Sequence, residues 1–111
     1  MNSLYFLQLA YKCRNSYKWS TEYHFKTVPS GCDWSPRLII YGDMGVKGAA
    51  TFNYIRNEVK RGLADAIIHV GDFAYNMENN NGDVGDAFLR MLEPIASQVP
   101  YMTAVGNHEQ A

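Results

Sequence analysis

Three short apolar runs alternate with segments of helical periodicity in the second half of the chain. The runs are 38–41, 66–70 and 101–105, and they are nearly continuous in hydrophobicity, as strands covered on both faces of a parallel sheet are. Between the first two runs, apolar positions at helical spacing predict a helix over about 48–61, ended by Gly62. The alternation predicts successive βαβ units, and hence an α/β fold, from residue 37 onward.

A second apolar stripe predicts another helix between the last two strands. Its members are Val84, Phe88, Met91, Leu92 and Ile95. Because proline cannot donate its backbone nitrogen and its ring crowds the preceding turn, we expect Pro94 to kink or divide this helix.

The first part of the chain has a different pattern. Residues 21–28 alternate roughly between apolar and polar, which predicts a strand with one buried face whose apolar contacts come from Trp19, Tyr23 and Phe25. The stretch that follows has two prolines and a glycine and reads as a crossing loop. We therefore expect an N-terminal β unit over 1–30, a linker over 31–36 and the α/β body over 37–111.

Composition and charge narrow the classes of partner. The 111 residues suffice for one modest domain, and the formal net charge of −1 with scattered basic residues indicates neither a nucleic-acid partner nor an anionic membrane surface. No run of eighteen apolar residues and no convincing signal peptide occur in the printed sequence. Cys13 and Cys32 could form one bridge or be two unrelated thiols, so the redox compartment stays open.

Each predicted strand runs directly into a short polar motif. These are Gly42-Asp43-Met44-Gly45, Gly71-Asp72-Phe73-Ala74-Tyr75 and Gly106-Asn107-His108-Glu109. Right-handed crossovers make the strands parallel neighbours and bring their carboxyl ends to one edge, where open α/β sheets bind ligands. We therefore expect the chemistry-bearing side chains to converge there: Asp43, Asp72, Tyr75, Asn107 and His108.

The motifs contain two carboxylates, a phenol and an amide but no lysine or arginine. We expect these groups to repel one another or to lack polar partners unless a cation binds among them. Carboxylate and phenolate oxygens suit a small, highly charged ion such as ferric iron, and amide oxygen and imidazole suit a divalent neighbour. A carboxylate has enough lone pairs to bridge both ions, and Asp72 in the middle motif is the natural bridge. The sequence therefore predicts a metal site.

The three motifs resemble the first three of the five metal-binding motifs of the purple acid phosphatases, within the wider calcineurin-like metallophosphoesterase superfamily. The similarity is closest to the animal iron/zinc-type acid phosphatases and extends from about Tyr11. The region from Trp19 to Trp34 resembles the end of the fibronectin-like domain that precedes the catalytic domain in larger members. The resemblance implies a partial metallophosphoesterase sandwich, a βαβαβ half, preceded by the last strands of a fibronectin type III-like domain. It also implies a secreted or lysosomal location.

The resemblance also implies roles, residue by residue. Asp43 and Tyr75 would bind Fe(III), with Tyr75 as the phenolate that gives the purple colour; Asp72 would bridge the two ions. Asn107 would bind the divalent ion (Zn, Fe or Mn), and His108 would contact the substrate phosphate and assist the leaving group. The implied reaction is the hydrolysis of phosphate monoesters.

Two departures qualify this expectation. Gly45 stands where the wider superfamily has the histidine of Asp-x-His, and Tyr75 is supplied three residues after Asp72. The resemblance implies that this exchange separates the purple enzymes from ordinary phosphodiesterases of the superfamily. The family completes its site with three histidines from two later motifs, a Val-x-x-His type and a Gly-His-x-His type, and the printed sequence stops at Ala111 before either. His24 and His69 do not replace them, because His24 precedes the linker and His69 lies within a strand. We therefore expect a fragment with four of seven ligands.

Two other interpretations stay open at this point. A catalytically inactive partial domain would have the same three motifs. A nucleotide-binding βαβ unit would explain Gly42, Gly45 and Gly48, although the G-x-x-G-x-x-G spacing differs from the dinucleotide fingerprint and Asp43 would repel a pyrophosphate.

Overall fold

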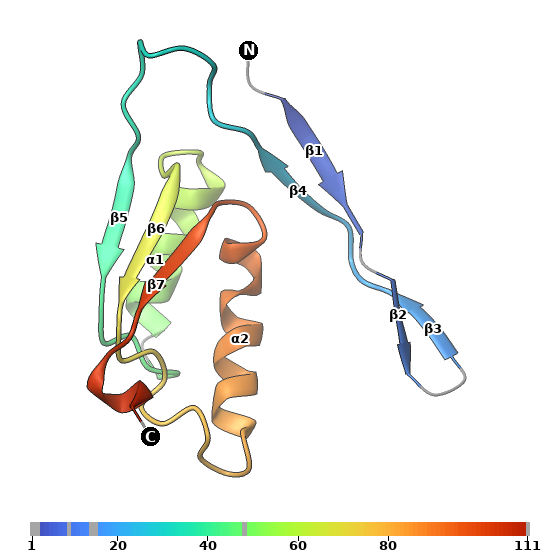
Figure 1. The fold of residues 1–111 in the computed structure, drawn as a ribbon, viewed down its shortest axis with the longest axis vertical. Coiled ribbons are helices and arrows are strands. Elements are labelled where there is room, and N and C mark those ends of the chain that lie inside the picture. Colours follow the sequence, from blue (N-terminus) through green and yellow to red (C-terminus); the bar gives the residue numbers. More distant parts are fainter. Residues whose placement is uncertain (1–2, 9, 14–15, 48, 111) are drawn as a thin grey trace.

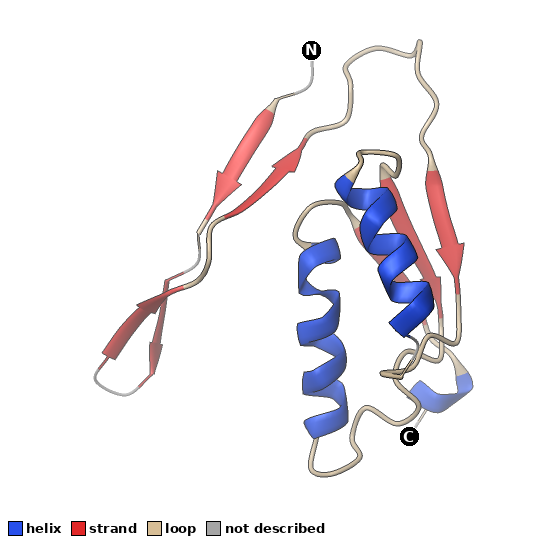
Figure 2. Cartoon of the chain, turned by 180° about the vertical axis from the view of Figure 1, so that it is seen from behind, coloured by secondary structure: helices blue, strands red, loops and turns tan. Residues whose placement is uncertain are grey.

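The chain folds into an antiparallel ribbon followed by an α/β body (Figure 1). The computed structural model describes residues 3–8, 10–13, 16–47 and 49–110. The ribbon projects away from the body in both views, so the two parts are joined mainly by the connecting segment 27–37 (Figure 2).

Four short strands make the ribbon. They are β1 (Leu4–Leu7), β2 (Ala10–Cys13), β3 (Ser16–Trp19) and β4 (Tyr23–Lys26). β1 pairs with β4 and β2 with β3, both antiparallel, in the registers Leu4↔Lys26 and Ala10↔Trp19. Two residues separate β1 from β2 and three separate β3 from β4, so the register slips by one residue between the two ladders.

The predicted strand near residues 21–28 is present as β4, but the prediction that it has one buried face is wrong. Trp19 is 67% exposed and Phe25 is 38% exposed. The physical reason is that a two-stranded ribbon has no second layer, and its apolar side chains can only pair across the strands. Tyr5 and Phe25 do so, with ring centroids 5.4 Å apart.

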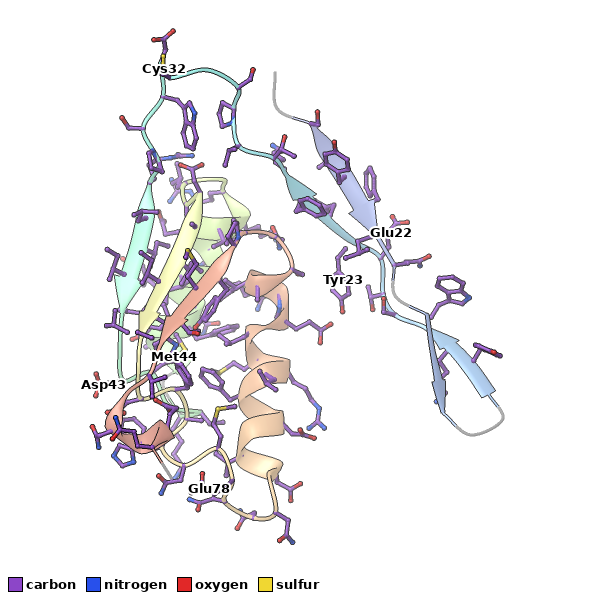
Figure 3. All side chains as sticks on the ribbon, in the orientation of Figure 1. Glu22, Tyr23, Cys32, Asp43, Met44 and Glu78 are labelled. Atoms are coloured by element: carbon purple, nitrogen blue, oxygen red, sulfur yellow. The ribbon has the colours of Figure 1, made fainter. Side chains whose placement is uncertain are left out.

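A side-chain hydrogen bond links the ribbon to the body. The Tyr23 hydroxyl donates a hydrogen bond to the Glu93 carboxylate, and Tyr23 points from the ribbon toward the helix α2 (Asp83–Ala96) of the body (Figure 3). Cys32 lies in the connecting segment as an exposed free thiol, and the side chain of Cys13 lies outside the described residues. The assignment of residues 1–30 to a fibronectin-like unit stays a prediction.

The body contains the predicted parallel sheet. Its strands are β5 (Leu38–Tyr41), β6 (Ala66–Val70) and β7 (Tyr101–Ala104), in the order β5-β6-β7. Both pairings are parallel, with Ile40 opposite Ile68 and Ile68 opposite Met102. The strand predictions are confirmed, with β7 one residue shorter than expected.

Two helices cover one face of this sheet. They are α1 (Ala49–Lys60) and α2 (Asp83–Ala96). Gly62 ends α1 as predicted: it has a φ of 67°, its N–H bonds to the Val59 carbonyl, and the Leu63 N–H bonds to the Glu58 carbonyl. α2 continues through Pro94 to Ala96, so Pro94 does not divide it.

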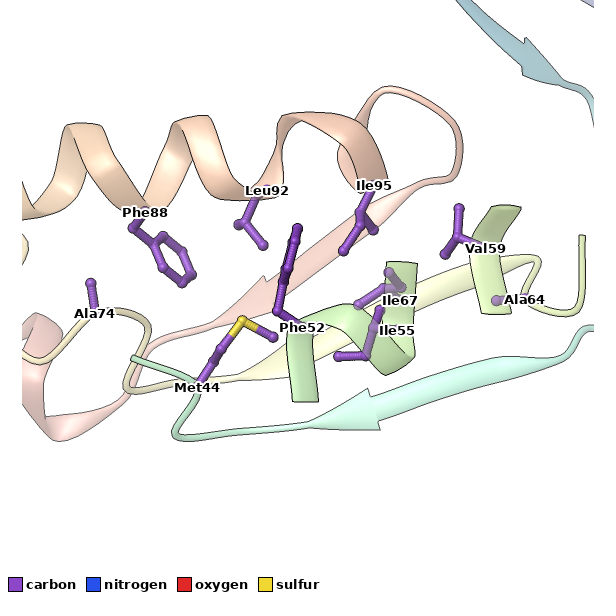
Figure 4. Close-up of a cluster of buried hydrophobic side chains, with 10 residues drawn as sticks. All are labelled: Met44, Phe52, Ile55, Val59, Ala64, Ile67, Ala74, Phe88, Leu92 and Ile95. Atoms are coloured by element: carbon purple, nitrogen blue, oxygen red, sulfur yellow. The ribbon is translucent and has the colours of Figure 1, made fainter. Parts of the chain in front are cut away.

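The core lies between the helices and the sheet (Figure 4). It consists of Phe52, Ile55 and Val59 from α1, Phe88, Leu92 and Ile95 from α2, Ile67 from β6, and Met44, Ala64 and Ala74 from the connecting loops. Ile67 and Ile95 are fully buried at its centre. Burying these side chains supplies the main favourable free energy of folding.

The opposite face of the sheet is apolar but exposed. Leu38, Ile40, Val70 and Met102 are each about half exposed or more. The prediction that the strands are covered on both faces is therefore wrong for the part of the chain that the structure describes. With sequential strand order, both right-handed crossovers pass over the same side, and the two helices are seen together on that side in Figure 2.

Candidate functional site

The loops that follow β5, β6 and β7 meet at the carboxyl-terminal edge of the sheet. The Asp43 N–H donates to the Gly71 carbonyl at 3.2 Å and the Gly45 N–H to the Phe73 carbonyl at 2.8 Å, which pairs the first loop with the second. The His108 N–H donates to Asp72 Oδ1 at 3.0 Å, which joins the second loop to the third. The predicted convergence of the three motifs is therefore observed.

The second and third loops also approach each other through their backbones. A Cβ added to Gly71 would lie 2.6 Å from the nitrogen and the Cα of Gly106, closer than real Cβ contacts come. Only hydrogen at both positions permits this approach. The spacing between these two loops is therefore determined by main-chain atoms.

Asp43 and Tyr75 are joined directly. The Tyr75 hydroxyl donates to Asp43 Oδ1 at 2.8 Å, and this hydrogen bond, with burial and the nearby carboxylates, raises the pKa of the phenol. An ion with six ligands at about 2.0 Å has neighbouring ligand oxygens about 2.8 Å apart, which is the separation seen here. The two oxygens therefore fit one small, hard cation.

The backbone at these residues is unusual. Asp43, Asp72 and Tyr75 have φ values of 55°, 53° and 53°, in the left-handed region that non-glycine residues rarely adopt. Aspartate tolerates this region, whereas a bulky tyrosine does so only when its surroundings hold it. Such strained residues cluster at functional sites.

His108 packs edge-on against the Tyr75 ring, with the ring centroids 4.9 Å apart. Its Nδ1 lies 3.0 Å from the side-chain oxygen of Asn76. Because a carbonyl oxygen only accepts, Nδ1 carries the proton, and Nε2 is left to face a ligand. Sequence reasoning missed Asn76, although its position directly after Tyr75 placed it in the same loop.

Glu109 is the second residue that sequence reasoning missed. Its Oε2 accepts the N–H groups of Asp72 at 2.8 Å and Gly106 at 3.0 Å, and its Oε1 accepts that of Phe73 at 2.9 Å. Burial opposes the charge of Glu109, but the three donors outweigh it and lower the pKa of the carboxyl. Glu109 thus fastens the third loop onto the second. Glu109 is part of the third motif, but its hydrogen bonds with main-chain N–H groups cannot be predicted from a sequence pattern.

Asn107 is less closely tied to the other candidates. It is exposed and begins the short 3-10 helix η1 (Asn107–Glu109). Within the described residues its side chain makes no hydrogen bond to the other four candidates. It is brought to the same edge of the sheet as Asp43, which lies at the end opposite Cys32 (Figure 3).

The charge of the site is unbalanced. The carboxylates of Asp43, Asp72 and Glu109 each contribute to the raised pKa of Tyr75. The ion pairs made by the described residues all lie elsewhere, at Arg37–Asp65, Arg61–Glu58 and Arg90–Asp86. Across the described residues, no three His, Cys, Asp or Glu side chains come close enough to hold a metal among themselves. The donor set that fits a cation therefore includes the phenol of Tyr75.

His69 is fully buried on the helix-covered side of β6. Its Nδ1 lies 2.8 Å from the Tyr101 hydroxyl, which also bonds to Tyr41, and its ring packs against Tyr41 and Phe73. Nε2 of His69 has no hydrogen-bond partner among the described residues, and burial lowers the pKa of the imidazole. His69 packs in the core beneath the site, and His24 lies exposed in the ribbon.

The sequence matches the calcineurin-like phosphoesterase family over residues 36–111. The chain belongs to this family. Among curated relatives, acid phosphatase type 7 of mouse (Mus musculus) is 47% identical over 103 residues, which are 93% of this chain and 24% of that protein. The human (Homo sapiens) protein of the same name is 42% identical over 94% of this chain and 24% of its own length.

A solved structure of a purple acid phosphatase from yellow lupin (Lupinus luteus) seeds matches this calcineurin-like phosphoesterase with a TM-score of 0.75 and 34% identity. The match covers 96% of this chain and 21% of the lupin chain. This calcineurin-like phosphoesterase thus has part of the purple acid phosphatase fold and spans about a quarter of the length of the relatives named here. None of its described helices is both long enough and apolar enough to cross a membrane.

Proposed function

We propose that the three loops form the first part of a dinuclear metal centre that hydrolyses phosphate monoesters. In this proposal Asp43 and Tyr75 would hold Fe(III), Asp72 would be a ligand shared by both ions, and Asn107 would hold a divalent ion, Zn, Fe or Mn. The observation that carries it is the 2.8 Å contact between the Tyr75 hydroxyl and Asp43 Oδ1, in a site where the described residues form no ion pair with a lysine or arginine. The names of the relatives support the reaction class.

When bound, the two ions would neutralise the charge of the phosphate oxygens and lower the pKa of a bound water. The protein residues then have distinct tasks. Asp43, Asp72 and Tyr75 supply hard oxygen donors, and Glu109 holds the loops that carry Asp72 and Asn107. Proton transfer to the departing alkoxide falls to His108.

The orientation of His108 supports this task. Asn76 accepts a hydrogen bond from Nδ1, which orients the ring and leaves Nε2 outside this bond, and the backbone N–H of His108 donates to Asp72 Oδ1. A protonated Nε2 would donate to the ester oxygen as negative charge develops on it. Asn76 therefore acts as a positioning residue for the leaving-group acid.

We further propose that turnover requires ligands outside this sequence. The family resemblance implies three more histidines from two motifs that follow the third one, and no histidine follows His108 in the printed sequence. On its own the chain would then have partial metal binding and little or no activity. The competing function is an inactive partial domain that binds no iron at all. The secreted or lysosomal location implied by the resemblance stays a prediction.

Iron binding distinguishes the proposed metal centre from an inactive partial domain. Fe(III) added to the purified chain is expected to produce a visible tyrosinate-to-iron charge-transfer band that disappears in Tyr75→Phe. Tyr54→Phe is the matched control, because Tyr54 is 77% exposed on α1. Absence of the band from the wild type, or its persistence in Tyr75→Phe, would contradict the proposed centre.

Turnover is tested on an extended protein, in which residues 1–111 are joined to the rest of mouse acid phosphatase type 7. We expect this extended protein to hydrolyse a chromogenic phosphate monoester at mildly acidic pH and the Asp72→Asn variant to lose that activity. Activity that is unchanged in Asp72→Asn would exclude the bridging role. Full activity of the 111-residue chain alone would exclude the need for further ligands.

A further inference from the structure

A cavity of about 630 Å³ lies beside the candidate metal centre, on the side of the helices. It is bounded by the loop after β5, the loop after β6 and the first turns of α2. Its apolar and aromatic walls are Met44, Val46, Ala74, Tyr75, Val84 and Ala87. Met44 and Ala74 are nearly buried and close the end of the core there (Figure 4).

The chemistry of the walls favours an apolar occupant. Ligand pockets have volumes of about 300–1,000 Å³ and are lined mainly by apolar side chains with a few polar groups. Here the polar residues Lys47, Asn80 and Asp83 are all exposed, at the rim. A hydroxyl placed deep among Met44 and Val84 would find no side-chain partner, and leaving it unpaired costs free energy.

Tyr75 connects the cavity to the candidate centre. Its ring lines the cavity, and its hydroxyl bonds to Asp43. The ring lies against Gly45, where an added Cβ would come within 3.3 Å of Tyr75 Cδ2, and it contacts the edge of His108. A phosphate held near Asp43 and His108 would therefore have its organic group beside the Tyr75 ring, at the opening of the cavity.

We propose that this cavity binds the organic group of the phosphate ester and selects apolar groups of aromatic size, so that aryl and branched-alkyl phosphates are preferred to esters of small polar alcohols. The inference rests on the proposed phosphatase function and specifies its substrate class. A polar sugar or glycerol group would gain little from these walls and would lose hydrogen bonds to water.

Binding of the organic group is tested without metal or turnover. The probe is 4-tert-butylphenol, titrated into the metal-free chain and followed through the amide NMR signals of Val84 and Ala87. We expect saturable shifts at both, at least tenfold weaker binding in Ala87→Glu, and a smaller loss in Ala87→Gln. Ala96→Glu, on the exposed end of the same helix, should bind as the wild type does. No shifts at Val84 and Ala87, or equal binding by wild type and Ala87→Glu, would overturn the pocket.

Selectivity is tested on the extended protein with phenyl phosphate and 4-tert-butylphenyl phosphate, whose leaving groups have similar acidity. We expect kcat/KM to be about tenfold higher for the larger ester and the ratio to fall toward one in Ala87→Glu but not in Ala96→Glu. A ratio near one in the wild type would overturn the proposed selectivity. If neither ester is hydrolysed while the phenol still binds at Val84 and Ala87, the phosphatase function fails and the pocket remains as a binding site for an apolar group.

Discussion

Glu109→Gln tests whether one carboxylate fastens the third loop onto the second. In the wild type, Oε2 accepts the N–H groups of Asp72 and Gly106, and Oε1 accepts that of Phe73. Glutamine has one side-chain oxygen, which can keep the first two bonds. Its NH₂ group then faces the Phe73 N–H, which loses its acceptor.

The magnitude follows from these three bonds. A half-buried donor left without a partner costs about 1–3 kcal/mol, and the two bonds that remain change from charge-assisted to neutral, a loss of about 0.5–1 kcal/mol each. Water recovers part of this loss because the loops are only half-buried. We therefore expect the free energy of unfolding to fall by about 2–3 kcal/mol in Glu109→Gln.

Urea unfolding followed by circular dichroism measures this change, and amide hydrogen exchange locates it. Protection should fall at Asp72, Phe73 and Gly106 first. Glu78→Gln is the control, because Glu78 is an exposed carboxylate in the loop after β6. A loss below about 0.5 kcal/mol, or an equal loss in Glu78→Gln, would refute the fastening role.

Three further changes test the body of the fold. Ile95→Ala removes a fully buried side chain and should lower the free energy of unfolding by about 3 kcal/mol in urea titrations, against under about 1 kcal/mol for the exposed Leu89→Ala on the same helix. Gly62→Ala forces a Cβ into the left-handed position that ends α1 and should cost about 1 kcal/mol, seen as a lower midpoint of thermal unfolding. Burial lowers the pKa of His69, so its neutral form stabilises the fold above the unfolded pKa of about 6.5, and this contribution is lost as the pH falls from there through the lower folded pKa. Urea unfolding between about pH 7 and 5 should therefore show a steeper loss of stability for the wild type than for His69→Phe, and equal slopes would contradict the assignment.

The strands, helices and loop motifs of the body could be predicted because each leaves a local signal. Apolar runs mark β5 and β6 to the residue, and Gly62 marks the end of α1 through its need for a left-handed backbone. The convergence of Asp43, Asp72, Tyr75 and His108 followed from strand order alone. The metal assignments themselves stay predictions.

The features that the sequence did not predict depend on tertiary packing, which the periodicity of apolar residues does not indicate. Alternation at Tyr23 and Phe25 is the same for a ribbon in solvent as for a strand in a sandwich, so it could not tell that Phe25 is exposed. The Glu109 contacts join a side chain to main-chain N–H groups of another loop, and every residue has such groups. For α2, tertiary packing of Ile95 after Pro94 outweighed the local cost of the proline.

Because Gly71 and Gly106 approach each other closely, the separation of the ions and the preference for one ester over another would depend on different parts of this chain. In the proposed centre the separation of the two ions would depend on how near the second and third loops come, and that distance is limited by the main-chain contact of Gly71 with Gly106. Ester preference would depend on side chains such as Val84 and Ala87, which lie on another element. A mutant library that varies the α2 positions and keeps both glycines could therefore alter which esters are accepted while the scaffold for the ions stays as it is.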